Sequence, residues 1–576
     1  MTPFTAPFFE HPGPRAFHKT FRSGIPKMVW TVLLLATLYS CGVSKSLKDL
    51  PELGNYQNEI PQRRQLSDSS FTIGHNFLSK NRQGLWELYV DGDPLEIGLK
   101  TGSLTQELFQ FQERAFINKI NELVPSEGKQ KLLKKFLAWY NRKMYRNIDT
   151  RFKAEIYGLS RYASKNYDHI ATPYLRVLYF HGAHDIGHAL QDLALVGCSS
   201  FATWGNKTAD GKLLIGRNFD FYAGDDFAKN KIIAFIAPDK GHNFMSVTWA
   251  GFIGVLSGMN DQGLTVTINA GKSSIPLVAK TPISIVAREI LQYAGTIDEA
   301  IAIAKKREVF VSESIFVGSA KDKKAAIIEV SPEKFGVYEV DNNGQLICAN
   351  HFQSAAYAQD KANTKHILES HSQYRYERME ELLGQGPKMT PESAVEILRD
   401  REGLGDKAIG YGNEKALNQL MAHHGIVFQP EDLRVWVSSN PYQMGEFVAY
   451  DLQKVFAQKG SVDGIPKLAT AEKNIPKSAF LETAAYEAYG SYKSLNKEVS
   501  KAIASKTHLE RSLLVDFEQS NPEFWEVHYL IGQYYLQRGY DTLALSAFRK
   551  AAEKEVTTVP DREKVAKLIH KLERRL

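Results

Sequence analysis

The residue type most suited to covalent chemistry in this sequence is a cysteine, Cys198, in a turn of small residues that begins at Gly197. A free thiol has a pKa of about 8.5 and is mostly protonated at neutral pH, so a nucleophilic cysteine needs a base. A cut directly before Cys198 would supply one, because an α-amine has a pKa of about 8 and can take the thiol proton. We therefore predict that the chain is cut at Gly197–Cys198 and that Cys198 is the nucleophile.

The residues around Cys198 favour this chemistry. Gly197 can adopt strained conformations that let the sulfur approach the preceding carbonyl. Asp210-Gly211 predicts a hairpin turn whose return strand carries Arg217 and Asp220. An arginine would stabilise a thiolate, and an aspartate would accept from the α-ammonium. Residues i and i+3 point to opposite faces of a strand. For both Arg217 and Asp220 to reach Cys198, the strand must therefore bend or end near Asp220. The alternative is a surface ion pair.

Histidines offer a competing mechanism. His184 and His188 have the i, i+4 spacing that presents one helix face to a metal ion, but the glutamate of a His-Glu-x-x-His motif is absent. We therefore predict no metal site, and expect these residues and His181 to pack the segment before the cut. A cysteine–histidine pair without self-cleavage, using His351 or His423, stays open as an alternative.

The elements that must position these residues change character at Cys198. Residues 84–197 have helical periodicity, and short strands with turn residues between them follow from 199. A helical pair at 282–306 and helices within 353–425 interrupt the strands. Blocks of strands separated by helical layers predict an α+β sandwich over 198–460. Residues 42–83 are polar and irregular, which predicts a linker.

The two ends of the chain have separate characters. Residues 1–41 carry basic residues, an apolar run too short to span a membrane, and the lipobox-like Leu-Tyr-Ser-Cys ending at Cys41. They predict export to the cell envelope, with Cys41 lipidated on the periplasmic or outer-membrane side; Met28 is an alternative start. Residues 461–576 are helical and contain one unit resembling a tetratricopeptide repeat, with small Gly532 and Ala544 where its helices would pack. Such an appendage packs on the main domain or docks a protein partner.

Composition excludes several function classes. At 576 residues the chain predicts two or three domains. A net charge of +6 is small for this length and argues against a nucleic-acid binder. Neither a phosphate-binding glycine motif nor a paired CxxC occurs, so we expect no nucleotide cofactor and no structural zinc. Three cysteines are too few for a disulfide framework, and Cys348 is expected to be buried and inert.

The motifs around Cys198 together resemble a known family. Gly-Cys-Ser-Ser-Phe-Ala-x-Trp-Gly, Asp-Gly-Lys-Leu-Leu-x-Gly-Arg-Asn-Phe-Asp and Asn350-His351-Phe352 look like the acyl-coenzyme A:6-aminopenicillanic acid acyltransferase family, and Gly92 to Gly102 resembles the start of its pro-segment. That family belongs with bile-salt hydrolases, penicillin V acylases and acid ceramidase among the N-terminal-nucleophile (Ntn) hydrolases. The resemblance covers about residues 88–455. It implies a four-layer αββα sandwich and self-cleavage into two chains.

The resemblance also implies roles for single residues. Cys198 matches the nucleophile, whose freed amine is the base. Arg217 and Asp220 match the pair that holds thiolate and amine. Asn269 matches a position of the oxyanion hole, and Asn350 matches a second asparagine near the tetrahedral centre.

A further arginine of the family is harder to place. Arg375, in Ser-Gln-Tyr-Arg-Tyr-Glu-Arg, fits best. Arg378 on the same predicted helix and Arg434 on a later strand are rivals, and each fits an exposed charge equally well.

Together these patterns predict an exported hydrolase or acyltransferase that acts on the amide bond of small N-acyl compounds through a thioester at Cys198. Acyl-coenzyme A is scarce outside the cell membrane, which favours hydrolysis over transfer. Two other interpretations remain open: a non-catalytic envelope lipoprotein that docks partners through its helical tail, and a cysteine–histidine peptidase without self-cleavage.

Overall fold

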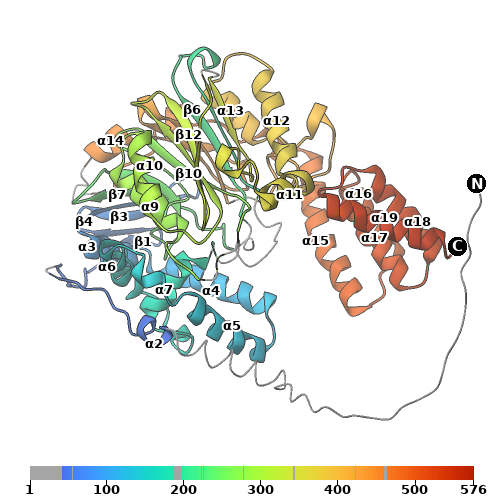
Figure 1. Ribbon diagram of the computed structural model, residues 1–576, viewed down its shortest axis with the longest axis horizontal. Helices are drawn as coiled ribbons and strands as arrows, with labels where there is room; N and C mark the ends of the chain where they lie inside the picture. Colours follow the sequence, from blue (N-terminus) through green and yellow to red (C-terminus); the bar gives the residue numbers. More distant parts are fainter. Residues whose placement is uncertain are drawn as a thin grey trace, which may run out of the picture.

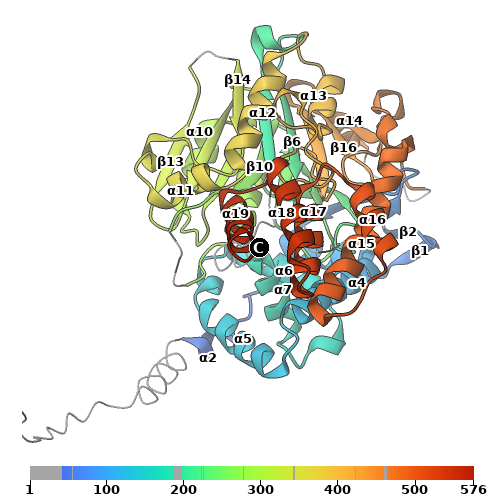
Figure 2. The same ribbon diagram turned by 90° about the vertical axis from the view of Figure 1, so that its right-hand side faces the viewer.

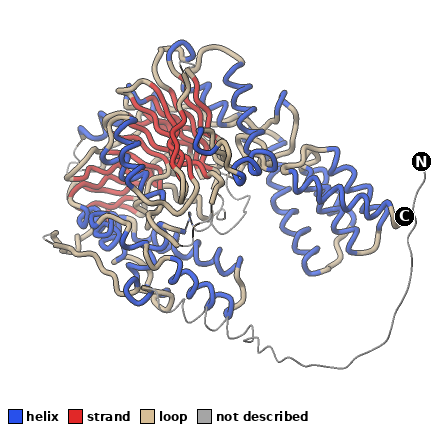
Figure 3. The backbone as a smooth tube through the Cα atoms, in the orientation of Figure 1, coloured by secondary structure: helices blue, strands red, loops and turns tan. Residues whose placement is uncertain are grey.

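Two β-sheets are stacked face to face, and helices cover the outer face of each (Figure 1). The computed structural model describes residues 42–576 apart from 55, 184, 186–196, 222–223, 225, 275, 277, 342–343, 422 and 459–463. Figure 3 shows the strands gathered between the helical layers. The predicted four-layer αββα sandwich is confirmed.

The first sheet has eleven strands in the described part of the chain. In spatial order they are β1 (Arg64–Ser67), β2 (Ser70–Ile73), β3 (Asn76–Lys80), β4 (Trp86–Gly92), β7 (Ile232–Pro238), β8 (Phe244–Thr248), β9 (Ser257–Asn260), β10 (Leu264–Ala270), β11 (Glu313–Ser319), β12 (Lys324–Val330) and β13 (Phe335–Tyr338). Neighbouring strands pair antiparallel except β4 and β7, which run parallel.

The second sheet is smaller and carries Cys198 at its start. Its strands, in spatial order, are β14 (Gln345–Cys348), β5 (Ser199–Thr203), β6 (Leu214–Phe219), β15 (His424–Gln429), β16 (Arg434–Ser438) and β17 (Phe447–Asp451). The inner faces of both sheets share one apolar core, to which β6 contributes Ile215, β7 contributes Phe235 and β15 contributes Ile426. Burial of this core holds the sheets together.

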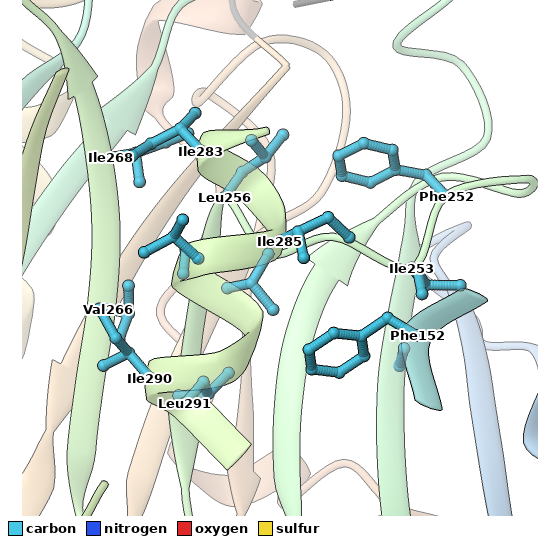
Figure 4. Packing of buried hydrophobic residues seen from close by; sticks show 14 of the residues in the cluster. Phe152, Phe252, Ile253, Leu256, Val266, Ile268, Ile283, Ile285, Ile290 and Leu291 are labelled. Carbon is cyan, nitrogen blue, oxygen red and sulfur yellow. The ribbon is translucent and has the colours of Figure 1, made fainter. Parts of the chain in front are cut away.

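Helices pack on both outer faces. The first sheet is covered by α9 (Ile283–Tyr293) and α10 (Ile297–Lys306), and the second by α12 (Ser372–Gly384) and α13 (Pro391–Leu398), with α11 (Lys361–Glu369) packed on α12. Figure 4 shows why α9 lies where it does: Ile283 and Ile290 point from one helix face toward Val266 and Ile268 of β10. This is the two-turn spacing that gives a helix one apolar face.

The segment before Cys198 is helical from residue 94, as predicted. In its described residues the helices are α3 (Pro94–Leu104), α4 (Gln106–Leu123), α5 (Glu127–Tyr140), α6 (Thr150–Ser160) and α7 (Pro173–His181); the short helix α2 (Val43–Ser46) lies earlier, before the strands. Helices α3 and α6 pack so closely that a Cβ on Gly98 would lie 2.1 Å from the carbonyl oxygen of Glu155. Gly98 and Gly102 therefore serve helix packing, whereas Gly92 ends strand β4 with a φ of +125°.

The linker predicted for 42–83 is wrong over residues 64–80, which form β1 to β3, and β4 replaces the start of the helical segment predicted from 84. All four residues of β1 are exposed, so the strand lacks the apolar alternation that predicts strands. Strand β4 is buried by a parallel partner that lies far later in the chain. No local pattern can indicate such a partner.

The C-terminal region is helical, as predicted. Its helices are α15 (Ala484–Ser505), α16 (Arg511–Ser520), α17 (Trp525–Gln537), α18 (Asp541–Glu553) and α19 (Val559–Glu573), whereas α14 (Leu452–Ala457) packs on β7 and β17 of the sandwich. Gly532 of α17 lies against the ring of Phe548 on α18 and buried Ala544 belongs to the same core, so the two helices pack closely where small residues were noted. Short 3₁₀ helices occur at Met144–Arg146, Lys165–Tyr167, Gly205–Lys207, Ala355–Tyr357, Leu404–Asp406, Pro430–Asp432, Ala471–Lys473 and Ala479–Glu482.

Helices α15 to α19 form a layer of their own outside the sandwich, to its right in Figure 1 and in front of it in Figure 2. They contact it through residues 400–420, which we call the bridging segment. Glu555 accepts from the Lys415 ammonium at 2.6 Å, and its carbonyl accepts from the Asn413 amide at 2.9 Å. Leu420 belongs to the apolar core of the C-terminal helices. The appendage thus packs on the main domain, which was one of its two predicted arrangements.

Candidate active site

Cys198 lies directly before β5 at the junction of the two sheets, with 1% of its surface exposed. Strand β5 pairs with β6 so that Ser200 lies opposite Arg217. Strands β6 and β10 and helix α12, which carry most of the surrounding residues, lie together in both ribbon views (Figure 1, Figure 2). Burial raises the pKa of the Cys198 thiol to about 11, although the nearby Arg217 charge lowers it. In the uncut chain the thiol is therefore protonated at neutral pH.

Arg217 points from β6 toward the first sheet and contacts the thiol. Its Nη2 lies 3.8 Å from Cys198 Sγ and donates to the carbonyl oxygen of Ile268 at 2.6 Å. Its Nη1 donates to Ser257 Oγ at 2.5 Å. Strand β6 is buried on both faces, and its side chains alternate between them: the next residue, Asn218, turns away from the first sheet and donates to the Leu398 carbonyl. Arg217 is thus a fully buried cation fixed against the sulfur.

Asp220 reaches the site because β6 ends at Phe219, which is the strand end that the joint use of Arg217 and Asp220 requires. Its backbone oxygen accepts from the Gly197 amide at 3.2 Å. Carboxylate atom Oδ1 accepts from Gln443 Nε2 at 3.2 Å, while Oδ2 has no hydrogen-bond partner among the described residues. Burial raises the pKa of Asp220 to about 7, against the opposing charge of Arg375. An α-ammonium on Cys198 would supply a cationic donor here.

This raised pKa gives a prediction for stability. The native protein holds the Asp220 proton more tightly than the unfolded chain does. Burying this carboxyl therefore costs no folding free energy below about pH 4, and the cost grows until the pH passes about 7. In a Cys198→Ala background, which keeps the chain uncut, Asp220→Asn should stabilise more at pH 8 than at pH 5, by roughly 2–3 kcal/mol. Urea unfolding at both pH values measures this difference, and a pH-independent effect of Asp220→Asn would contradict it.

Arg375 comes from α12 and contacts the backbone of the cysteine. Its Nη1 donates to the Cys198 carbonyl at 2.7 Å and to Ser199 Oγ at 2.9 Å, and its Nη2 donates to Asn350 Oδ1 at 2.6 Å. Its rival Arg378, one turn on, is bound to Asp400. Arg434 starts strand β16, opposite Gln429 and Asp451. Of the three arginines proposed from the sequence, the structure brings Arg375 to Cys198.

The two predicted asparagines lie in the same buried network but are directed at backbone carbonyls. Asn269 Nδ2 donates to the carbonyls of Cys348 and Ala349 at 3.2 and 3.3 Å, and its Oδ1 accepts from Ser200 Oγ. Asn350 Nδ2 donates to the Ala270 carbonyl at 2.9 Å. An oxyanion role for Asn269 therefore requires its amide to leave these carbonyls, and it stays a prediction.

The described histidines serve packing and support. His181 accepts from the Ile253 amide, bonds the Val177 carbonyl and stacks on Phe252, so it anchors α7. His424 reaches Arg217 only through Ser257 Oγ, which lies 2.9 Å from His424 Nε2. Burial lowers the pKa of His424 well below its usual value. No hydrogen bond found between described residues joins a histidine to Cys198, which leaves the cysteine–histidine interpretation without geometric support.

Sequence reasoning missed two glutamines. Gln443 binds Asp220, and Gln419 Nε2 in the bridging segment donates to the Gly197 carbonyl at 3.2 Å. Both lie in irregular segments, where a glutamine gives no signal. The structure also corrects the reason for Gly197. The φ of Gly197 is not positive, and a Cβ there would lie 1.9 Å from Gln419 Nε2. The glycine is therefore needed so that the Gln419 amide can come close to the backbone, and not for a strained conformation.

Two expectations concern ions and membranes. Across the described residues, no group of three or more histidine, cysteine or acidic side chains is arranged to hold a metal ion. His184 and His188 lie outside the described residues, as do residues 1–41 with Cys41. None of the helices in the described ranges combines the length and the apolar character needed to cross a bilayer.

Comparison with known proteins finds a family that is similar to the middle of the chain. Residues 206–440 match the family described as acyl-coenzyme A:6-aminopenicillanic acid acyl-transferase. Over this part the chain is similar to that acyltransferase family. The matched range holds Arg217, Asp220, Asn269, Asn350 and Arg375 and begins shortly after Cys198. The match therefore covers strands β6 to β16 but not β1 to β5 or β17, and it supports an amidase or acyltransferase.

Two curated relatives are similar over part of their length. An uncharacterized protein from Archaeoglobus fulgidus is 27% identical over 281 residues, which cover 45% of each chain. Protein dcd1B from Dictyostelium discoideum is 25% identical over 192 residues, which cover 33% of this chain and 36% of that protein. The chain thus spans less than half the length of either relative.

Solved structures similar to this chain are more distant. An N-acylethanolamine-hydrolyzing acid amidase ortholog from Caenorhabditis elegans has 18% identity and a TM-score of 0.30, covering 41% of this chain and 93% of that one. A mutant of a conjugated bile acid hydrolase from Clostridium perfringens has 13% identity and a TM-score of 0.30, covering 47% of this chain and 96% of that one.

Proposed function

We propose that this chain cuts itself at Gly197–Cys198 and then cleaves the amide bond of small N-acyl compounds through a thioester on Cys198. The observation that carries the proposal is the buried thiol itself. Arg217 Nη2 lies 3.8 Å from its sulfur, and Asp220 lies beside the same cysteine with one carboxylate oxygen unpaired among the described residues. A cation and an anion are thus placed for a thiolate and for the ammonium that cleavage would create.

Self-cleavage would begin at the scissile peptide bond. The Cys198 sulfur adds to the Gly197 carbonyl carbon, the carbon–nitrogen bond breaks, and the thiol proton ends on the freed Cys198 amine. Water then hydrolyses the thioester, which leaves a carboxylate on Gly197 and restores the thiol. Asp220 would hold the new ammonium, since its backbone oxygen already binds the Gly197 amide.

Turnover of a substrate would repeat the same chemistry. The free amine takes the thiol proton, and the thiolate, stabilised by Arg217, adds to the amide carbonyl of the substrate. The proton passes to the leaving nitrogen, and water releases the acyl group from the thioester. We propose hydrolysis as the main reaction. Export of the protein directed by residues 1–41, with a lipid anchor at Cys41, would place the enzyme where acyl-coenzyme A is scarce.

N-terminal sequencing of the purified protein tests the central step. The expected result is two fragments, one of which begins at Cys198 with Cys-Ser-Ser-Phe. An intact, folded chain would overturn the proposal and favour the non-catalytic scaffold whose C-terminal helices dock a protein partner. Release of free amine from a panel of N-acyl amides, with Cys198→Ala as the blank, then identifies the substrate class.

A further inference from the structure

We infer that Gln419 is the catalytic residue that stabilises the oxyanion of self-cleavage, by donating a hydrogen bond to the carbonyl oxygen of Gly197. This rests on the proposed function, because it assigns a role within the cleavage of Gly197–Cys198. When the sulfur adds to the Gly197 carbonyl carbon, the electron pair of the double bond moves onto that oxygen. A fully buried donor already 3.2 Å from the oxygen would stabilise this charge without reorganisation.

The contacts of the scissile peptide single out Gln419. The Gly197 amide donates to the Asp220 carbonyl, and Arg375 Nη1 donates to the carbonyl of Cys198, one residue past the bond that breaks. Among the described residues, no arginine or asparagine side chain forms a hydrogen bond with the oxygen of Gly197. Gln419 Nε2 makes the hydrogen bond to that oxygen. The residues predicted from the family motifs hold the thiol and the flanking backbone, and Gln419 completes the set at the reacting carbonyl.

The surroundings of Gln419 fix which end of its amide faces Gly197. Nε2 also lies 3.3 Å from the carbonyl oxygen of Glu414. Carbonyl oxygens only accept hydrogen bonds, so the two acceptors require the amide nitrogen, and not Oε1, at this position. Gln419 therefore donates to the scissile oxygen.

The C-terminal helices hold the bridging segment on both sides of Gln419. The Leu420 carbonyl accepts from Tyr489 Oη at 3.2 Å, and the Glu414 carboxylate accepts from Thr557 Oγ1 at 3.0 Å. Lys415 pairs with Glu555 at 2.6 Å, with 7% of the lysine side chain exposed. An irregular segment clamped in this way can keep an amide in place, as a preorganised oxyanion donor requires.

Gly197 is matched to this donor. A Cβ on Gly197 would lie 1.9 Å from Gln419 Nε2 and 2.7 Å from Cδ, so any other residue must push the amide away from the carbonyl. The glycine before the nucleophile is thus the residue that lets Gln419 reach the oxygen.

Pulse-labelled synthesis of the full chain, followed by a time course of conversion into two fragments, tests the assignment. Removing one oxyanion donor slows a reaction by about 10²–10³-fold, so Gln419→Ala and the isosteric Gln419→Glu should process that much more slowly. The matched control is Gln429→Ala, which removes another buried glutamine amide, bound to Asp210 in the turn between β5 and β6, and should process at the parental rate.

The pH profile separates a donor from a packing residue. The ratio of the Gln419→Glu rate to the parental rate should rise as the pH falls, because a protonated carboxyl can donate whereas a carboxylate repels the oxyanion. Gly197→Ala should also slow processing, and Gly197→Ala/Gln419→Ala should be no slower than Gln419→Ala alone. If the parental chain is cut and folded Gln419 variants are cut at the same rate, this inference alone is overturned. If the parental chain stays intact, the proposed function is overturned.

Discussion

Cys198→Ala is expected to leave the chain intact and to reduce amide turnover by about 10⁴-fold or more, which is the order of loss seen when a covalent nucleophile is removed. The sulfur is both the atom that attacks Gly197 and the atom that would carry the acyl group. Alanine is smaller and apolar and fits the site, where the cysteine is 1% exposed, so the variant should fold. Mass spectrometry of the purified chain and release of amine from N-acyl substrates measure the two effects.

The chain offers a matched control in Cys348. It is also a fully buried cysteine at the end of a strand of the second sheet, and burial raises the pKa of its thiol. Cys348→Ala removes the same atoms from the same layer and should keep both cleavage and turnover within a few-fold of the parent. A cut, active Cys198→Ala protein would show that the nucleophile lies elsewhere.

Arg375→Lys is expected to slow cleavage and turnover by about 100-fold. The planar fork of Arg375 donates to the Cys198 carbonyl, to Ser199, to Asn350 and to His371. A lysine keeps the charge but cannot reproduce that fork. Hydrogen bonds to charged groups contribute about 1.5–3 kcal/mol each, so losing one or two corresponds to this change in rate.

Arg378→Lys on the same helix is the control for that effect. Arg378 is 1% exposed and binds Asp400 and Asp406 away from the cysteine. Its substitution should lower the midpoint of thermal unfolding while the rate of cleavage per folded molecule stays at the parental value. If Arg375→Lys and Arg378→Lys lower the rate of cleavage per folded molecule equally, Arg375 contributes to general stability and not to the active site.

The sequence predicts the part of the site that lies on one hairpin. Cys198, Arg217 and Asp220 are brought together by a turn between neighbouring strands, and the end of β6 at Phe219 gives the bend that their joint use needs. Local rules suffice here because paired strands fix the register of their residues.

What the sequence could not predict depends on contacts between distant segments. Gln419 reaches Gly197 from an irregular segment whose position is set by helices still later in the chain. Neither its residue type nor its spacing separates it from any solvated glutamine. The motif favours Arg375, but Arg378 lies three residues on at a neighbouring position of α12, so the short motif alone could not exclude it.

The parallel pairing of β4 with β7 has a consequence for what a cut at Gly197 would leave behind. Strands β1 to β4 precede that bond, yet they complete the same sheet as β7 to β13, which follow it. The N-terminal fragment would therefore stay as a subunit and would not depart as a released propeptide. Denaturing the cut protein would become a dissociation, and its refolding would be a reaction between two chains whose yield depends on protein concentration.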